Sequence, residues 1–187
     1  DQAQANIVTA ATELATLVRS EIIAKGGKRV AVMTLPDSAS TPYGSTLSAD
    51  GRALLTGLSA AFNAALLAGL DGSGARIIDA RALNAAVQAS PSTYKLTNIT
   101  TPACNATIIN GVTGGRVTDG SSLFCNAASA AVFTAAGLPN LSALTPGVLA
   151  STYLFADGVH PTTGGHKIFA DQIWTKLKDF GWVPENL

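Results

Sequence analysis

The first part of the chain repeats apolar residues at intervals of three to four positions. This spacing is typical of an amphipathic helix and predicts one over residues 1–25. Gly26-Gly27 follows directly, and glycine is a common helix end. The residues that carry the spacing are Ile7, Ala11, Leu14, Val18 and Ile22.

Two short apolar runs then flank a second helical pattern. Residues 28–35 contain four consecutive apolar residues, which predicts a strand covered by helices on both faces. After a polar loop, Ser48 or Asp50 can cap a helix that extends to about Leu70. Residues 75–80 form a second predicted strand, and a short helix is predicted over residues 81–89. The expected buried face of the long helix consists of Leu54, Leu58, Phe62 and Leu66.

Regular patterning fades over residues 90–150, apart from a short predicted helix over residues 129–136. Ser, Thr, Asn, Gly and Pro are abundant there. A stretch of this length without periodic structure is unusual in a compact domain. We therefore expect an elaborated, irregular insertion within one domain that spans residues 1–187.

The pattern returns near the C-terminus. Tyr153-Leu154-Phe155 predicts a buried strand end, and Asp157-Gly158 predicts a tight turn. Thr162 or Thr163 can cap a final helix over about residues 162–179. Strands and helices thus alternate along the chain, which predicts an α/β protein with a parallel sheet and right-handed crossovers.

Composition narrows the class of protein. The chain has 187 residues, of which 47% are apolar and 13% charged, enough for one domain with a sizeable core. Net charge is zero and no basic run occurs, so neither nucleic acid nor an anionic membrane surface is expected as a partner. No apolar run approaches about 18 residues, so we expect no membrane span. Because the chain begins with Asp1 rather than Met, we expect a mature, processed or trimmed product.

Cys104 and Cys125 are the two cysteines, and both lie in the irregular region. A cysteine pair in a loop-rich segment predicts a disulfide, here closing a loop of about 20 residues and worth about 3 kcal/mol. A disulfide would indicate a secreted or periplasmic protein. The alternative is two free thiols in a reducing cytosol.

Candidate chemistry gathers at the turn after the last predicted strand. His160 follows Asp157 by three residues, and Pro161 stiffens the exit of the turn. An acid and an imidazole on one rigid turn suit a carboxylate that orients a general-base histidine. His166 is expected to be a supporting or surface residue near the helix start. We expect no metal site, because His166 would have to point back across a helix turn to join the other two.

The stretch from Asp157 to His166 reads D-G-V-H-P-T-T-G-G-H. It resembles the last sequence block of the SGNH, or GDSL, serine hydrolases. The resemblance implies a flavodoxin-like, three-layer α/β/α fold around a parallel sheet, here with a reduced number of strands. It also implies that Asp157 orients His160 and that His160 is the general base for a serine nucleophile. No cofactor is expected for this chemistry.

In outline the resemblance extends over residues 1–80 and 150–182. Two blocks of the family are not found: the Gly-Asp-Ser-Leu block that carries its nucleophile and the Gly-x-Asn-Asp block. Three interpretations follow. The chain is a small esterase that uses another serine, or a fragment whose N-terminal partner chain supplies the serine, or a non-catalytic binding module.

Ser38 is the serine that best fits the first interpretation. The first predicted strand delivers Asp37-Ser38 into a loop at its carboxyl end, where open parallel sheets place their active sites. An ordinary turn is the alternative role for this pair. Ser40 and Ser45 lie farther along the loop and are weaker candidates. The pattern gives no position relative to His160 for Ser121, Ser122 and Ser129.

The resemblance implies that the chain hydrolyses carboxylic esters, and we expect small, neutral esters with short acyl or aryl groups. We expect residues 90–150 to form the walls of the substrate pocket. The natural ester and its acyl length do not follow from the pattern. The apolar first strand of so small a sheet needs a cover. We therefore expect a homodimer or a complementary N-terminal chain as partner.

Overall fold

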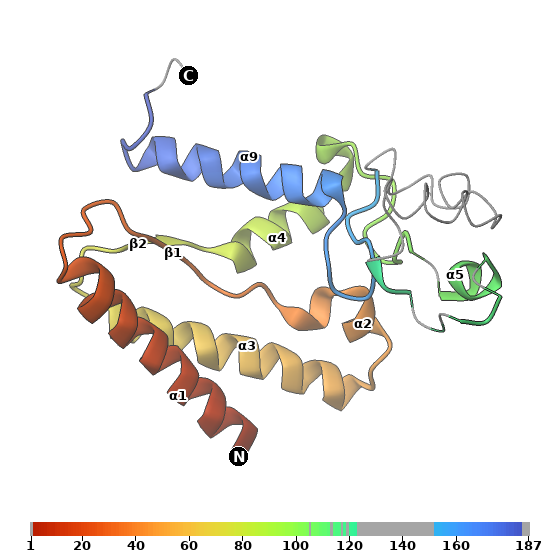
Figure 1. The fold of residues 1–187 in the computed structure, drawn as a ribbon, viewed down its shortest axis with the longest axis horizontal. Helices are drawn as coiled ribbons and strands as arrows, with labels where there is room; N and C mark the ends of the chain where they lie inside the picture. Colours follow the sequence, from red (N-terminus) through yellow and green to blue (C-terminus); the bar gives the residue numbers. More distant parts are fainter. Residues whose placement is uncertain are drawn as a thin grey trace. The chain divides into compact units, whose positions relative to one another are not determined.

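The computed structural model describes residues 2–104, 106–112, 114–116, 118, 120–122 and 152–184 (Figure 1). The chain groups into two compact units. Unit 1 consists of Asp1–Ala39, Leu47–Ala86 and Asp171–Leu187, and unit 2 of Ser40–Thr46 and Val87–Ala170. The single domain expected from the sequence stays a prediction.

Unit 1 contains a parallel pair of strands. β1 (Ala31–Met33) pairs with β2 (Arg76–Ile78), with Val32 opposite Ile77. The connection between them contains α3 (Ala49–Leu70), since parallel neighbours need a crossover of this kind. The mixed α/β class and the parallel pairing are confirmed. Both strands are shorter than predicted, and the sheet has two strands in the described part of the chain.

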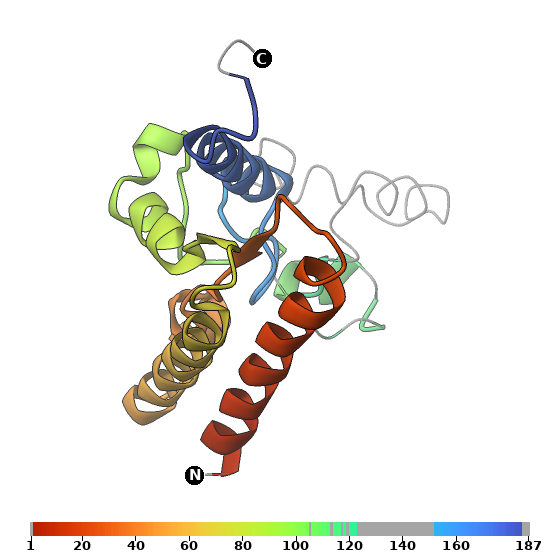
Figure 2. The same ribbon diagram turned by 90° about the vertical axis from the view of Figure 1, so that its left-hand side faces the viewer.

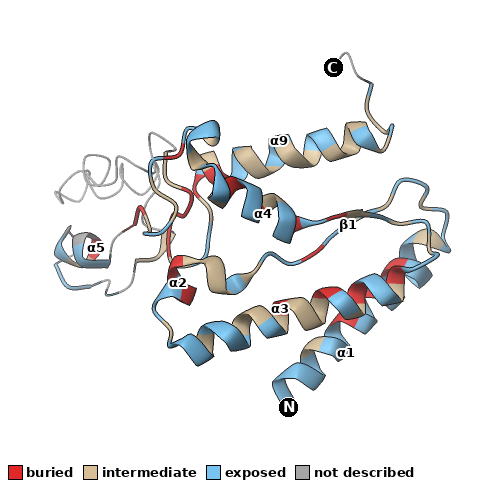
Figure 3. Cartoon of the chain, turned by 180° about the vertical axis from the view of Figure 1, so that it is seen from behind, coloured by how far each residue is buried: buried red, intermediate tan, exposed pale blue. Residues whose placement is uncertain are grey.

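The N-terminal helix packs against α3. It comprises α1 (Gln2–Leu17) and continues as a π-helical segment, η1 (Val18–Ile23), as far as the predicted glycine end. Figure 3 shows buried residues of α1 and α3 on the faces that the two helices turn toward each other. The buried apolar residues of this cluster are Ala11, Ala15, Val18, Leu66 and Leu70.

The face expected for the first helix is only partly correct. Leu14 and Ile22 are exposed, although both have the predicted spacing. The helices approach through small residues instead: a Cβ placed on Gly69 would lie 2.5 Å from the Cβ of Ala15. Because the helices lie this close, their contact buries small residues such as Ala15, and longer side chains lie outside it. Leu54 on α3 is exposed as well, so the buried face expected for that helix is also only partly correct.

The sheet of unit 1 has helical structure on both sides (Figure 2). Val32 and Ile77 pack against the cluster formed by α1 and α3. On the other side, the guanidinium of Arg76 lies 5.8 Å from the ring centroid of Phe180, just after α9 (Thr163–Asp179). Cover is incomplete, because Met33 is 44% exposed. The prediction of a strand buried on both faces was therefore wrong for this residue.

α3 is the one helix in the described part of the chain that is long and apolar enough to cross a membrane by length and composition. Asp50 and Arg52 are its charged residues. This corrects the expectation that no stretch approaches that length. Such a helix is weak evidence, because core helices pass the same test. The absence of a membrane span stays a prediction.

Unit 2 has a separate apolar core and little regular structure. It contains α2 (Pro42–Ser45), the end of α4 (Ala80–Ala89), η3 (Pro91–Tyr94), α5 (Ala106–Val112) and the start of α9. The helix predicted over 81–89 is confirmed, whereas α5 was missed. The helix predicted over 129–136 lies outside the described residues. The buried core consists of Val87, Leu96, Leu154 and Phe155.

The third predicted strand, at residues 153–155, is not part of the sheet. Its backbone pairs on one side with residues 97–104, where Leu154 N–H donates to the carbonyl of Asn98 at 2.8 Å. On its other side Thr162 N–H donates to the carbonyl of Leu154 at 3.0 Å. On both edges, the backbone of residues 153–155 therefore forms hydrogen bonds with irregular segments rather than with strands. The pattern identified an extended buried segment but not its partners.

Candidate active site

A tight hairpin presents the predicted acid and base. Ala156 N–H donates to the carbonyl of His160 at 2.7 Å, which closes the loop around Asp157. From α2, Tyr43 N–H donates to the carbonyl of Gly158 at 2.8 Å and holds the tip of the loop. Backbone hydrogen bonds therefore hold both the base and the tip of the turn that carries Asp157 and His160.

Thr162 joins this hairpin to α9. Its hydroxyl accepts from Gly165 N–H at 3.0 Å, the helix cap that the sequence predicts. The same hydroxyl donates to the carbonyl of Tyr153 at 2.6 Å, and Thr162 is buried. A Cβ on Gly165 would lie 2.6 Å from the carbonyl oxygen of Leu154, so the helix start can approach the hairpin only through glycine.

Asp157 and His160 form an acid–imidazole dyad. Nδ1 of His160 lies 2.9 Å from Oδ1 and 2.8 Å from Oδ2 of Asp157. The Asp157 side chain is 11% exposed and the His160 side chain 68% exposed. The acid is thus buried behind the base, while the imidazole faces solvent. The structure brings these two predicted residues together.

The Asp157 carboxylate is held as an anion by backbone donors. Oδ1 accepts from Val159 N–H at 2.9 Å and from His160 N–H at 2.8 Å, while Oδ2 accepts from Ser122 N–H at 3.1 Å. Partial burial acts to raise the pKa of Asp157. Hydrogen bonds from His160, Val159 and Ser122 outweigh burial and hold the pKa well below its ordinary value.

This arrangement sets the tautomer of His160. An ionised carboxylate can only accept hydrogen bonds, so Nδ1 of the neutral imidazole carries the proton. Nε2 is then left with its lone pair. A neutral imidazole with Nε2 available is the form that removes a proton from a hydroxyl. In the neutral imidazole, the hydrogen bond to Asp157 therefore selects the tautomer that a general base needs.

A cavity of about 340 Å³ lies beside the dyad. Three segments of unit 2 form it, and its described lining residues are Pro102, Cys104, Ala106, Gly120, Ser121, Asp157, Gly158, Val159 and His160. Pro102, Cys104, Ala106, Gly120 and Ser121 belong to the irregular region, whose role as the wall of a substrate pocket stays a prediction. None of these nine residues is Lys or Arg.

Residues 120–122 are the part of the site that sequence reasoning missed. Ser122 supplies a backbone donor to Asp157, and Ser121 lines the cavity with His160. Gly120 allows this segment to approach, because a Cβ there would lie 2.6 Å from the carbonyl oxygen of Cys104. The local sequence signal for this segment is a glycine followed by two serines in a loop. That signal does not indicate that the segment contacts Asp157.

Ser38 lies in unit 1, at the start of a short 3₁₀ turn, η2 (Ser38–Ser40). Thr56 and Ser59 of α3 fix its surroundings. The Thr56 hydroxyl donates to both oxygens of Asp37, at 3.1 and 3.0 Å. Ser59 Oγ lies 3.5 Å from Ser38 N and 3.5 Å from Ser38 Oγ. The structure leaves the relative placement of the units open, so a Ser38–His160 contact is not tested.

The loop before Ser38 is also tied to α3. The side-chain amide of Asn63 accepts from Leu35 N–H at 2.8 Å and donates to the Leu35 carbonyl at 2.9 Å. Asn63 thus satisfies both backbone groups of one residue, as a neighbouring strand would. Together with Thr56 and Ser59, it gives the Asp37-Ser38 pair a structural explanation that needs no catalysis.

The remaining predicted residues have more ordinary positions. Ser45 Oγ donates to the carbonyl of Pro42 at 2.6 Å within α2. Ser40 accepts at its carbonyl from Gln88 Nε2 at 3.4 Å. His166 is exposed on the first turn of α9. Ser129 lies outside the described residues.

Cys104 is fully buried, and its N–H donates to the carbonyl of Ala156 at 2.7 Å. It therefore lies next to the hairpin that carries Asp157. Cys125 lies outside the described residues, so the disulfide stays a prediction.

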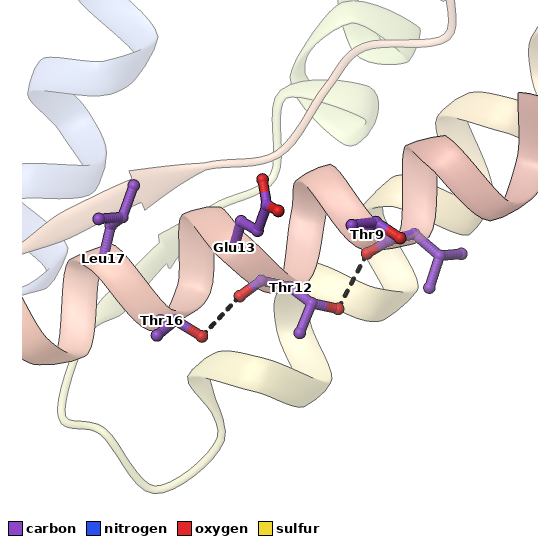
Figure 4. Close-up of a pocket in the computed structure, with 6 residues that line it drawn as sticks. Thr9, Thr12, Glu13, Thr16 and Leu17 are labelled. Atoms are coloured by element: carbon purple, nitrogen blue, oxygen red, sulfur yellow. Dashed lines mark hydrogen bonds between the residues drawn. The ribbon is translucent and has the colours of Figure 1, made fainter.

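A second cavity, of about 490 Å³, follows one face of α1 (Figure 4). Its threonines are committed to the helix itself: Thr12 Oγ1 donates to the carbonyl of Val8, and Thr16 Oγ1 to that of Thr12, each at 2.9 Å. Glu13 is the ionisable group among its described lining residues. This surface offers no pair of groups for acid–base chemistry, unlike the cavity at His160.

Comparison of the chain with known protein families and with curated proteins finds no match.

Proposed function

We propose that this chain carries the acid–base part of a serine carboxylic-ester hydrolase. The observation that supports the proposal is the Asp157–His160 dyad, with a buried, multiply hydrogen-bonded acid behind an exposed imidazole at a cavity. The sequence resemblance to the SGNH, or GDSL, hydrolases adds to it, and so does the parallel strand pair. A flavodoxin-like, three-layer fold belongs to this proposal.

In this proposal His160 acts twice. Its Nε2 takes the proton of a serine hydroxyl as the oxygen attacks the ester carbonyl, which forms a tetrahedral intermediate and an imidazolium. The imidazolium then gives that proton to the alcohol oxygen as its bond to the carbonyl carbon breaks, so the alcohol leaves and the acyl-serine remains. Water attacks the acyl-serine in the second half, with His160 again as base. Asp157 keeps Nδ1 protonated and stabilises the imidazolium in both halves.

The source of the serine separates two forms of the proposal. Ser38 would make the chain a self-sufficient esterase and requires that the loop after β1 reaches His160. A serine from a complementary N-terminal chain would leave Ser38 in its structural turn. The contacts of Leu35, Asp37 and Ser38 with α3 favour this second form, because they account for the turn without a catalytic role.

Hydrolysis of a chromogenic acetate ester tests the base. His160→Ala is expected to lower kcat by orders of magnitude, whereas His166→Ala is a matched control on the same segment and should hydrolyse as wild type. An unchanged rate in His160→Ala would exclude it as the base. A chain that folds but shows neither hydrolysis nor ester binding would be the non-catalytic module.

A fluorophosphonate probe with peptide mapping tests the serine. Label on Ser38 supports the self-sufficient enzyme, and Ser38→Ala should then abolish labelling. A folded chain that takes no label favours the form that needs a partner chain. Sedimentation of a clean monomer would count against the homodimer expected from the sequence.

Export belongs to the same proposal. A Cys104–Cys125 disulfide would close a loop that contains Ser122, whose N–H donates to Asp157, and would place the protein in an oxidising compartment. Intact-mass measurement after alkylation without reductant checks this. Two alkylated thiols in protein made under oxidising conditions would remove the basis for secretion or periplasmic location.

A further inference from the structure

We propose that the cavity beside His160 is the acyl-binding subsite and that Ala106 limits the length of the acyl group. The inference rests on the proposed ester hydrolysis and assigns one part of the ester to one part of the structure.

The walls favour an uncharged group. Pro102, Ala106 and Val159 provide apolar surface, and none of the described lining residues is a cation. Asp157 also faces the cavity and stays ionised, because its pKa is held low. A phosphate or carboxylate on the bound group would find no Lys or Arg among the described lining residues and would be repelled by Asp157.

The exposure of His160 decides which half of the ester enters. The imidazole must deliver a proton to the leaving alcohol, and its side chain is 68% exposed. The alcohol can therefore leave on the solvent side. The part that stays on the enzyme through the second half of the reaction is the acyl group, and the cavity is the hollow in the surface next to the base.

Size points to a short chain. At about 340 Å³ the cavity lies at the lower end of the range of small-molecule pockets, about 300–1,000 Å³. Gly120 cannot be enlarged without displacing the backbone of Cys104. Ala106 can, because it is exposed and is the first residue of α5. A larger side chain at position 106 would occupy the cavity without disturbing the core.

Non-hydrolysable ketones test the subsite without requiring activity. In ¹⁵N-labelled protein, 2-pentanone is expected to shift the backbone amides of Gly120, Ser121 and Val159. The Ala106→Leu variant should bind it about tenfold more weakly, since the new side chain takes the place of about two buried methylenes. Ala49→Leu changes the equivalent exposed first residue of α3 and should bind as wild type. The anion 4-oxopentanoate, of similar size, should bind more weakly than 2-pentanone.

Shifts confined to other residues, no binding at all, or equal binding by Ala106→Leu would overturn the subsite. His160→Ala separates this result from the proposed function. If the variant loses hydrolysis but still binds 2-pentanone, both proposals stand. If it hydrolyses esters as wild type does, the proposed base is wrong, and the ketone titration of Ala106→Leu still decides the subsite by itself.

Discussion

Both carboxylate oxygens of Asp157 lie within hydrogen-bonding distance of Nδ1 of His160, at 2.9 and 2.8 Å. The N–H at Nδ1 is thus shared between the two carboxylate oxygens in a bifurcated hydrogen bond. Three backbone N–H groups fill its remaining acceptor positions. The orientation of the imidazole is therefore fixed by a group that is itself fixed by the backbone.

Asp157→Asn tests the tautomer directly. An amide can donate to Nδ1 and so favours a neutral imidazole with its proton on Nε2, the wrong form for a base. We expect kcat for an acetate ester to fall by about 10³–10⁴ with little change in KM. Asp50→Asn, at the exposed first turn of α3, is the control and should leave both constants unchanged. Equal kinetics in the two variants would contradict the role given to Asp157.

Asp157 should also affect stability in acid. Its folded pKa lies below that of the unfolded chain, which is about 3.9, so the carboxylate stabilises the fold above about pH 4. This contribution is lost as pH falls below about 4 through the folded pKa. The difference in free energy of unfolding between wild type and Asp157→Asn should therefore shrink on acidification. Urea unfolding between about pH 3 and 7 measures it, and a pH-independent difference would refute the shift.

Gly120→Ala should misplace the loop that supports Asp157. The new Cβ would lie 2.6 Å from the carbonyl oxygen of Cys104, so the loop must move and Ser122 N–H must retreat. We expect the pKa of Asp157, followed by NMR, to rise toward its ordinary value, and ester hydrolysis to fall by up to about a hundredfold. Gly111→Ala in α5 meets open space and is the control. An unmoved pKa would show that Ser122 does not hold the acid.

Two glycines of α3 should respond oppositely to alanine. At Gly69 the new methyl would lie 2.5 Å from Ala15, and we expect a loss of about 1–2 kcal/mol in the free energy of unfolding. At Gly57 nothing lies within 4 Å, so helix propensity alone should give a gain of about 0.5–1 kcal/mol. Thermal or urea unfolding compares them. A gain in both variants would mean that the helices can move apart at little cost.

Local signals predicted much of this structure. Ser48 and Thr162 cap α3 and α9 as expected, because a cap and its helix are neighbours in sequence. The dyad was predictable for the same reason, since Asp157 and His160 lie on one turn. The parallel strand pair also followed from alternation of apolar runs and a helix.

Features set by distant residues were not predictable. The Ser122 donor reaches Asp157 across 35 residues of sequence, and no period marks it. The close contact at Gly69 and Ala15 buries small residues where the pattern favoured Leu14. The segment at 153–155 is extended and buried, but hydrophobicity alone does not say that irregular chain, rather than the sheet, supplies its partners.

The short span of the hairpin also has a consequence for folding. Bringing Asp157 to His160 closes only three residues of chain, whereas bringing Ser122 to Asp157 closes 35. Loop-closure entropy rises with length, so the turn can form while the rest of unit 2 is still open. The acid and base would then meet early during refolding, and the cavity beside them would take shape in a later, slower step.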